Sequence, residues 1–329
     1  MTHNKMTHHE KMALTYYKQV DKDCPTLAQY SRNLNLLYLS HALDPCYHRE
    51  AYIDQIQKIL LRKSKANVLL TGVAGCGKTA LVEGVAAQMT KRKLAYELAC
   101  DQEWNAYKTM VRARMRADGA CGDEDEEGFE APPKPHLCDC VIYDLSLTAL
   151  VGGTKYRGDF EDRLQKILNE CKVHPNVILF IDEIHRLTAV GKAEGSESTA
   201  QALKPALARK ELRVIGATTS EEKAYISKDA ALWRRFCDIT VAPLSGEAAE
   251  KTAEHILEDY CKFHEIVTDA SAVELLQWVQ QKLSNSVFPD NLINVIDETL
   301  ASAVFDGRYA VGMAQFQQVL DRLAENAPK

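Results

Sequence analysis

A group of small residues with a lysine and a threonine follows a short apolar stretch, and its spacing suits phosphate binding. Residues 72–79 read Gly-Val-Ala-Gly-Cys-Gly-Lys-Thr and fit the pattern G-x-x-x-x-G-K-[S/T] at every position. Glycines let the backbone curl its N–H groups around an anion, and the N-terminus of a following helix adds positive charge. We expect Lys78 to reach the β- and γ-phosphates of a nucleotide, and the Thr79 hydroxyl to bind Mg²⁺. The predicted nucleotide contacts here are Gly72, Gly75, Cys76, Gly77, Lys78, Thr79 and Ala80.

Two carboxylates end a second apolar stretch about one hundred residues later. Residues 177–181 read Val-Ile-Leu-Phe-Ile, and Asp182 and Glu183 follow them. Acids often end strands, but after a phosphate-binding loop this pair indicates phosphoryl transfer. Asp182 would hold Mg²⁺ with Thr79, directly or through water, and Glu183 would polarise the attacking water. The two motifs predict an enzyme that hydrolyses ATP to ADP and phosphate.

A threonine and an arginine pair suit the remaining needs of that reaction. Thr219 ends the stretch 214–219, where its hydroxyl would contact the γ-phosphate and the attacking water; a simple strand cap is the alternative. Arg234 and Arg235 follow an apolar segment and suit an arginine finger, which stabilises charge on the transferring phosphate. A finger supplied by a neighbouring subunit requires an oligomer. The alternative for the pair is a surface group that forms salt bridges.

Alternating strands and helices are predicted to position these residues. Apolar runs indicate strands, and the stretches between them indicate helices, among them 54–65 and 78–89. This alternation is typical of an α/β fold with a mostly parallel sheet. The predicted strands are 67–71, 140–145, 177–181, 212–217 and 238–241. The pattern then changes to four helices without a strand signal, at 247–264, 269–283, 289–304 and 313–326.

The same patterns divide the chain into parts. We expect 1–40 to be an N-terminal tail with a lead-in segment, 41–242 to be a large α/β ATPase domain and 243–329 to be a small all-helical lid domain. Residues 101–137 interrupt the alternation of strands and helices, and they contain the acidic run 123–127 and several prolines. That composition predicts an exposed insertion, partly helical at its start.

Composition and charge exclude several classes of protein. With 46% hydrophobic residues among 329, the chain can bury a core, so it is neither disordered nor collagen-like. The net charge of −6 argues against non-specific binding of DNA or RNA, though not against a local basic patch. No apolar run approaches the length of a membrane span, and the polar N-terminus lacks a signal-peptide core. These two features predict a cytoplasmic protein, in which the 10 scattered cysteines are expected to be reduced thiols.

Several segments, in the right order, resemble the first ATPase module of the ClpA/ClpB family of AAA+ unfoldases. They are 147–164, 203–209, 216–219, and Pro289-Asp290 with 296–298, and the similarity extends over about residues 24–305 apart from the insertion. The resemblance implies an AAA+ P-loop NTPase fold, ATP and Mg²⁺, a homo-hexameric ring and a polypeptide substrate.

The resemblance also implies roles for individual residues. In that family a mobile loop lines the central pore, where an aromatic side chain grips an extended polypeptide without reading its sequence; an ordinary exposed tyrosine is the alternative here. A weaker match for a second pore loop is 191–195. The matching pore-loop residues are Lys155, Tyr156, Arg157 and Gly158, and the matching nucleotide-site residues outside the phosphate loop are Cys46, Tyr47 and Asp290.

The chain departs from the family pattern at several places. The segment 45–49 reads Pro-Cys-Tyr-His-Arg where the family has two aliphatic residues and a glycine, so the affinity or selectivity for the base is expected to differ. Asn291 replaces a family lysine near the nucleotide. The insertion is absent from the relatives considered, and would either dock a dedicated partner or be a solvated loop. No Ile-Gly-Leu or Ile-Gly-Phe tripeptide occurs, so no docking motif for a ClpP-type peptidase is found.

These observations favour a ring-forming ATPase that unfolds or remodels proteins by threading them through a pore. One alternative is an ATP-dependent regulatory or scaffold ring that acts on a dedicated partner without threading. A nucleic-acid remodelling AAA+ protein is a further alternative, against which the net charge and the aromatic pore loop both count.

Overall fold

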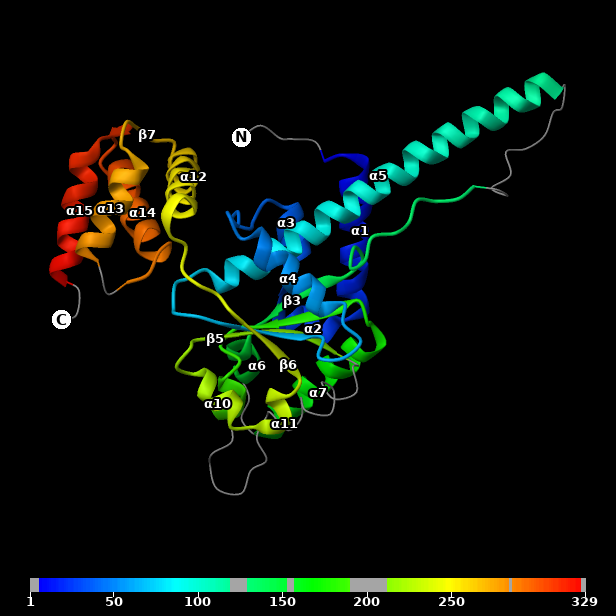
Figure 1. The fold of residues 1–329 in the computed structure, drawn as a ribbon, viewed down its shortest axis with the longest axis horizontal. Coiled ribbons are helices and arrows are strands. Elements are labelled where there is room, and N and C mark those ends of the chain that lie inside the picture. Colours follow the sequence, from blue (N-terminus) through cyan, green and yellow to red (C-terminus); the bar gives the residue numbers. More distant parts are fainter. Residues whose placement is uncertain (1–5, 119–128, 153–156, 190–211, 284–285, 327–329) are drawn as a thin grey trace.

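The structure is a computed structural model that describes residues 6–118, 129–152, 157–189, 212–283 and 286–326. Its centre is a six-stranded sheet in the order β1-β3-β4-β5-β2-β6 (Figure 1). Five strands run parallel, and β1 pairs antiparallel with β3 at one edge. The expected mostly parallel α/β sheet is therefore confirmed. The strands are β1 (Ser31–Asn33), β2 (Asn67–Thr71), β3 (Val141–Leu145), β4 (Val177–Ile181), β5 (Arg213–Thr218) and β6 (Phe236–Thr240).

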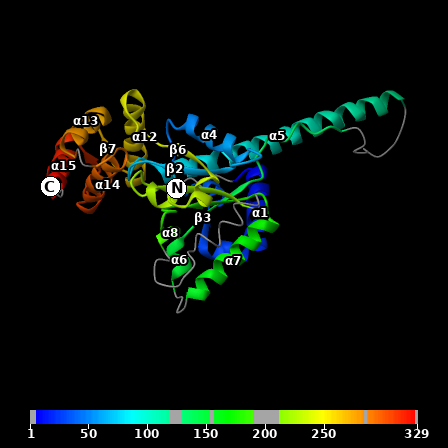
Figure 2. The same ribbon diagram turned by 60° about the horizontal axis from the view of Figure 1, so that its bottom comes forward.

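Helices cover both faces of the sheet, which is why the central strands β2 and β4 are buried along their whole length. All five residues of β2 and of β4 are buried. Side chains alternate between faces, so Leu69 joins a core with α1, α2 and α7. Val68 and Leu70 join a second core with α4 and the first part of α5 (Figures 1 and 2). These helices are α1 (His8–Asp23), α2 (Pro25–Tyr30), α4 (Glu50–Leu60), α5 (Lys78–Asp118) and α7 (Arg157–Val173).

The described residues before residue 40 form helices and a strand that pack against the sheet. Helix α1 begins with a capping box between Thr7 and Glu10 and buries Ala13, Tyr17 and Val20. Strand β1 then extends the sheet, and α3 (Leu34–Leu39) follows it.

Helix α5 is much longer than the predicted 78–89 and runs into the expected insertion. It has 41 residues and projects away from the rest of the molecule (Figure 1). No proline or glycine lies between Gly84 and Asp118, so nothing in this stretch interrupts the helix. Phe129 packs edge-on against Trp104 of α5, with 4.9 Å between the ring centroids, and so ties the returning chain to the helix.

Four helices form a separate layer at one side of the sheet and have their own core (Figure 1). They match the predicted helices closely, but two short strands, β7 (Val267–Thr268) and β8 (Ala310–Val311), pair in parallel among them. The expectation of an all-helical region therefore needs that small correction. Among the described residues, no helix is long and apolar enough to cross a membrane. The four helices are α12 (Gly246–His264), α13 (Ala272–Lys282), α14 (Asp290–Phe305) and α15 (Met313–Asn326).

Candidate nucleotide-binding site

The phosphate-binding loop and the acidic pair meet at one edge of the sheet. Strands β2, β4 and β5 are parallel neighbours, so their carboxyl ends lie together. The chain order reverses around β2, between β5 and β6, and ligands of open α/β sheets bind at such a switch point. This arrangement places Gly72, Asp182 and Thr219 on the same edge.

The loop after β2 has the backbone that its glycines allow. Gly75 and Gly77 have φ angles of 76° and 86°, which side-chain-bearing residues rarely adopt. A Cβ on Gly75 would also lie 2.9 Å from the Cβ of Asp290 at the start of α14. The loop therefore touches the helical region directly, through the residue pair Gly75 and Asp290. Cys76, which is part of this loop, is fully buried.

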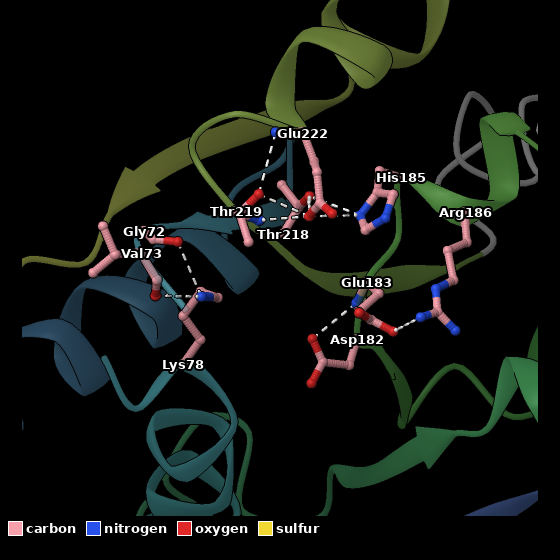
Figure 3. Close-up of polar contacts among 10 residues, drawn as sticks. All are labelled: Gly72, Val73, Lys78, Asp182, Glu183, His185, Arg186, Thr218, Thr219 and Glu222. Carbon is pink, nitrogen blue, oxygen red and sulfur yellow. Dashed lines mark hydrogen bonds and ion pairs between the residues drawn. The ribbon is translucent and has the colours of Figure 1, made fainter. Parts of the chain in front are cut away.

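Lys78 folds back over this loop. Its ammonium group donates to the carbonyl oxygens of Gly72, at 3.0 Å, and of Val73, at 2.9 Å (Figure 3). Carbonyl oxygens are neutral partners, so a phosphate would attract this cation more strongly. Lys78 thus lies at the loop, and its two carbonyl partners do not neutralise its positive charge.

Thr79 and Asp182 supply two oxygen atoms to one point. The Thr79 hydroxyl donates to Asp182 Oδ2 at 3.0 Å. A hydroxyl and a carboxylate side by side, beside a phosphate-binding loop, are the ligand types that Mg²⁺ prefers. The residues present therefore fit the ion that the sequence predicts.

Glu183 lies next in the chain but turns toward a different partner. Its backbone is left-handed, with φ of 48°, and its N–H donates to Asp182 Oδ1 at 2.8 Å. Its carboxylate forms an ion pair with Arg186 at 2.8 Å, and both side chains are about half exposed (Figure 3). Such an exposed pair contributes little stability, so Glu183 can exchange Arg186 for another partner at low cost.

Thr219 is held by a carboxylate that sequence reasoning did not single out. Its hydroxyl lies 2.8 Å from Glu222 Oε2 and accepts from the Glu222 N–H at 3.2 Å. His185 Nδ1 lies 3.2 Å from the same oxygen and 3.0 Å from the Thr218 hydroxyl (Figure 3). Burial raises the pKa of Glu222, but hydrogen bonds from Thr219, with His185 adding to them, outweigh it and hold the pKa below its ordinary value. This network links the ends of β4 and β5.

A small pocket lies between the phosphate loop and the four-helix layer. Its volume is about 160 Å³, and its lining includes Cys46, Tyr47, Ala80 and Glu83 from one side and Ile256 from the other. A Cβ on Gly84 would lie 2.8 Å from Cys46 Cβ, so the glycine lets segment 45–49 approach α5.

Tyr47 closes this pocket against α12. Its ring stacks on His255 with 4.5 Å between centroids, and its hydroxyl donates to Asp259 Oδ2 at 2.5 Å. Burial and the bond to Asp259 raise the pKa of Tyr47 well above its ordinary value, so the phenol keeps its proton. The pocket combines apolar side chains and the Tyr47 ring with several polar groups, a lining that suits a purine base.

Arg49 is a further residue of the site that the sequence did not reveal. It is 5% exposed, and its guanidinium donates to the carbonyl oxygens of Cys76, at 3.0 Å, and Ala242, at 2.7 Å. Arg49 thereby connects the phosphate loop with the chain that leads to α12. The residues that it joins are 27 and 193 positions away, so no local motif signals the contact.

Arg234 and Arg235 are not brought to this site. They follow α11 (Ala230–Trp233) and precede β6, at the opposite edge of the sheet from the phosphate loop. Both are exposed. If they act on a nucleotide, it belongs to another molecule.

The predicted pore loop lies mostly outside the described residues. This holds for Lys155 and Tyr156, for 191–195 and for the matched segment 203–209. Arg157 and Gly158 are the first residues of α7.

The fold and the site together define a P-loop nucleotide-binding domain with a helical region beside the nucleotide pocket. Residues 68–244 match the family described as "ATPase family associated with various cellular activities (AAA)", and the chain belongs to this family. Its relatives are Clp proteins. It is 35% identical over 282 residues to the ATP-dependent Clp protease ATP-binding subunit ClpA homolog of Porphyra purpurea. The aligned region covers 85% of this chain and 30% of that protein. It is 37% identical over 278 residues to the chloroplastic chaperone protein ClpC2 of Arabidopsis thaliana. The aligned region covers 83% of this chain and 25% of that protein.

Solved structures of Hsp104 have the same fold. A closed-state reconstruction of Hsp104 with ATPγS and FITC casein superposes with a TM-score of 0.70 at 28% identity, over 91% of this chain and 45% of that one. The S. cerevisiae Hsp104–ADP complex gives a TM-score of 0.70 at 29% identity with the same coverage. This chain therefore spans less than half of these Hsp104 chains and about a third or less of the Clp proteins above.

Proposed function

We propose that this protein binds ATP with Mg²⁺ between its large domain and its helical lid, and hydrolyses it to remodel other proteins, as a Clp-type ring. The observation that carries the proposal is the 3.0 Å contact between Thr79 and Asp182, beside the Lys78 loop and directly before Glu183. This contact joins the two sequence motifs at the point where phosphoryl transfer needs its charges.

Each residue has a distinct task in the proposed reaction. The N–H groups of the loop and Lys78 bind the β- and γ-phosphates, which would draw the ammonium group away from Gly72 and Val73. Thr79 and Asp182 would hold Mg²⁺, which when bound neutralises charge on the phosphates. Glu183 releases Arg186 and accepts a hydrogen bond from the attacking water. Thr219, oriented by Glu222, donates to the γ-phosphate or to that water.

The lid responds to the nucleotide through three contacts in this proposal. We place the boundary of the lid near residue 242. Gly75 meets Asp290, Tyr47 binds Asp259 on α12, and Arg49 joins the phosphate loop to Ala242. A base in the pocket would contact both sides at once. Loss of the γ-phosphate changes the loop, and these contacts transmit the change to the lid.

The ring and its substrate are proposed from the resemblance and from the relatives. A Hsp104 structure was solved with casein, a polypeptide. We propose a cytoplasmic homo-hexamer in which Tyr156 and its neighbours Lys155, Arg157 and Gly158 grip polypeptide, and Arg234 and Arg235 complete the site of the next copy. Direct docking to a ClpP-type peptidase is not proposed, because its motif is not found in this sequence.

Substitution of Glu183 by Gln tests the hydrolytic role. We expect this variant to bind ATP with unchanged affinity and to lose at least about 10²-fold in turnover, the usual size of a lost general base. Glu221→Gln is the matched control, because Glu221 is an exposed acid close to Thr219. Binding by fluorescence titration and phosphate release measure the two properties. Normal turnover in Glu183→Gln would refute the assigned role.

A regulatory or scaffold ring is the second candidate, and the projecting end of α5 favours it. This end carries Trp104 and Tyr107 beside Phe129, far from the nucleotide site (Figure 1). A dedicated partner could dock there. Tyr156→Ala separates the candidates: loss of remodelling with normal ATPase activity supports threading, whereas unchanged biological activity supports the scaffold.

A further inference from the structure

Basic side chains converge on a cavity at the edge of the sheet opposite the nucleotide site. Its volume is about 820 Å³, and it lies between the loop before β2, the start of β5 and the residues around α11. Among the described residues, no acidic side chain lines it. The cations that line it are Arg62, Lys63, Lys65, Arg213, Arg234 and Arg235.

These six cations, here called the basic cavity residues, have no carboxylate partner among the parts of the chain that the structure describes. The side chains of Arg62, Arg213 and Arg234 contact sulfur or carbonyl groups instead. Arg62 donates to Cys237 Sγ at 3.0 Å, and Arg213 to Cys140 Sγ at 3.4 Å. The chain has 46 acidic against 40 basic residues, so such an unpaired group is unexpected. A concave surface of one sign concentrates an ion of the opposite sign.

Hydrogen bonds hold the backbone at or beside Lys65, Arg213 and Arg235. Asn67, 4% exposed, donates to the Arg235 carbonyl at 3.2 Å and accepts from the Val214 N–H at 2.9 Å, so it ties three neighbouring strands together. Lys65 is left-handed, with φ of 53°, and its carbonyl accepts from Cys237. Residues other than glycine keep this backbone only where their surroundings impose it. A positioned group of charges fits a ligand better than a flexible surface does.

The cavity cannot serve the nucleotide of its own chain. Asn67 begins β2 at the cavity, and Thr71 ends it at the phosphate loop. Four residue steps of strand separate the two edges by about 13 Å. An anion in the cavity is therefore a second ligand.

We propose that the basic cavity residues form a binding site for a polyphosphate anion, in which Arg62, Lys63, Lys65 and Arg213 act together with the arginine pair. Guanidinium groups bind phosphate oxygens in a two-pronged fashion, and lysines add point charges. The phosphates of a nucleotide held by an adjoining copy and a free polyphosphate present the same chemistry. The first source rests on the proposed ring; the second does not.

Titration with inorganic tripolyphosphate tests the site. The full chain carries Lys78→Ala, so that the phosphate loop does not compete, and the salt concentration is held constant. We expect binding that weakens by about tenfold or more in Lys63→Gln with Lys65→Gln, and also in Arg213→Gln, which guards against a folding defect in either. Lys58→Gln with Lys91→Gln removes the same charge elsewhere and should leave affinity unchanged. Absence of binding, or equal weakening in the control, overturns the proposal.

The ATPase rate of the chain with Lys78 intact then distinguishes the sources. If the anion is a neighbour's nucleotide, Lys63→Gln with Lys65→Gln lowers turnover about tenfold or more while ATP affinity stays the same. If it is a free polyphosphate, turnover without added polyphosphate is unchanged. The proposed function has its own test in Glu183→Gln, whose failure would leave tripolyphosphate binding intact.

Discussion

At the scale of single residues, the site depends on side chains whose partners lie far away in the sequence. Lys78, Thr79, Asp182 and Glu183 could be predicted because their motifs are local. The role of Arg49 could not be predicted, because the two carbonyl groups to which it donates come near it only in the folded chain.

Replacement of Arg49 by Met tests its connecting role. Met keeps the apolar stem but loses two charge-assisted hydrogen bonds, each worth roughly 1.5–3 kcal/mol. We expect a lower free energy of unfolding and weaker ATP binding, measured by denaturant titration and fluorescence. Lys58→Met, on the exposed side of α4, is the control. Unchanged nucleotide affinity would mean that the link between loop and hinge has no functional effect.

Glu83, in the pocket beside Cys46, gives the fold a pH dependence. Burial raises its pKa from 4.5 to about 7, with Arg32 opposing and Asp44 adding to the rise. The folded protein keeps this proton to a higher pH than the unfolded chain, so ionisation destabilises the fold as pH rises from about 4.5 through about 7.

We therefore expect Glu83→Gln to raise the Tm of the nucleotide-free protein at pH 8 and to have little effect at pH 5. Thermal melts at both pH values measure this, with Glu103→Gln, an exposed acid on α5, as the control. An equal change at both pH values would contradict the assignment to Glu83 ionisation.

At the scale of elements, apolar runs with polar ends predicted strands well. The predicted bounds of β2 and β4 agree with the structure because Asn67 and Asp182 mark where burial begins or ends. The bounds of β5 and β6 shift by one or two residues, since pairing with β2 sets their ends. The helical start of the insertion was predicted, but the full length of α5 was not, because the acidic and proline-rich sequence that follows obscured one continuous helix.

The base of the projecting α5 is fixed by a buried charge. Lys93, 7% exposed, lies 3.0 Å from both Glu97 and Asp139, and its ammonium lies 4.3 Å from the Tyr16 ring centroid. Removal of one partner from such a group leaves uncompensated buried charge. The cluster holds α5, α1 and the chain before β3 together.

We expect Lys93→Met to lower the free energy of unfolding by roughly 3–5 kcal/mol. Lys91→Met, an exposed neighbour on the same helix, should change it by less than about 0.5 kcal/mol. Denaturant titration measures both. A loss in Lys93→Met no greater than in the control would show that the buried charge is dispensable.

At the scale of the whole molecule, the sheet separates the two groups of residues to which we assign roles in ATP hydrolysis. The phosphate loop lies at one edge, and Arg234 and Arg235 lie at the other. A closed ring of identical subunits, each using one surface toward the next, brings such edges together. The resemblance to Clp proteins predicts a ring, and the proposed role of the arginines requires one, because they lie away from the phosphate loop of their own copy.

The central claim is that each ATP is cradled by one copy and completed by the arginine pair of the next, and mixing two inactive variants tests it most directly. Lys78→Ala loses the phosphate loop, and Arg234→Ala with Arg235→Ala loses the pair. We predict that each alone is inactive, and that an equal mixture regains about a quarter of the wild-type ATPase rate, because one interface in four joins an intact loop to an intact pair. Full activity of the double arginine variant alone, or no recovery in mixed assemblies whose co-assembly is verified by mass measurement, would contradict the claim.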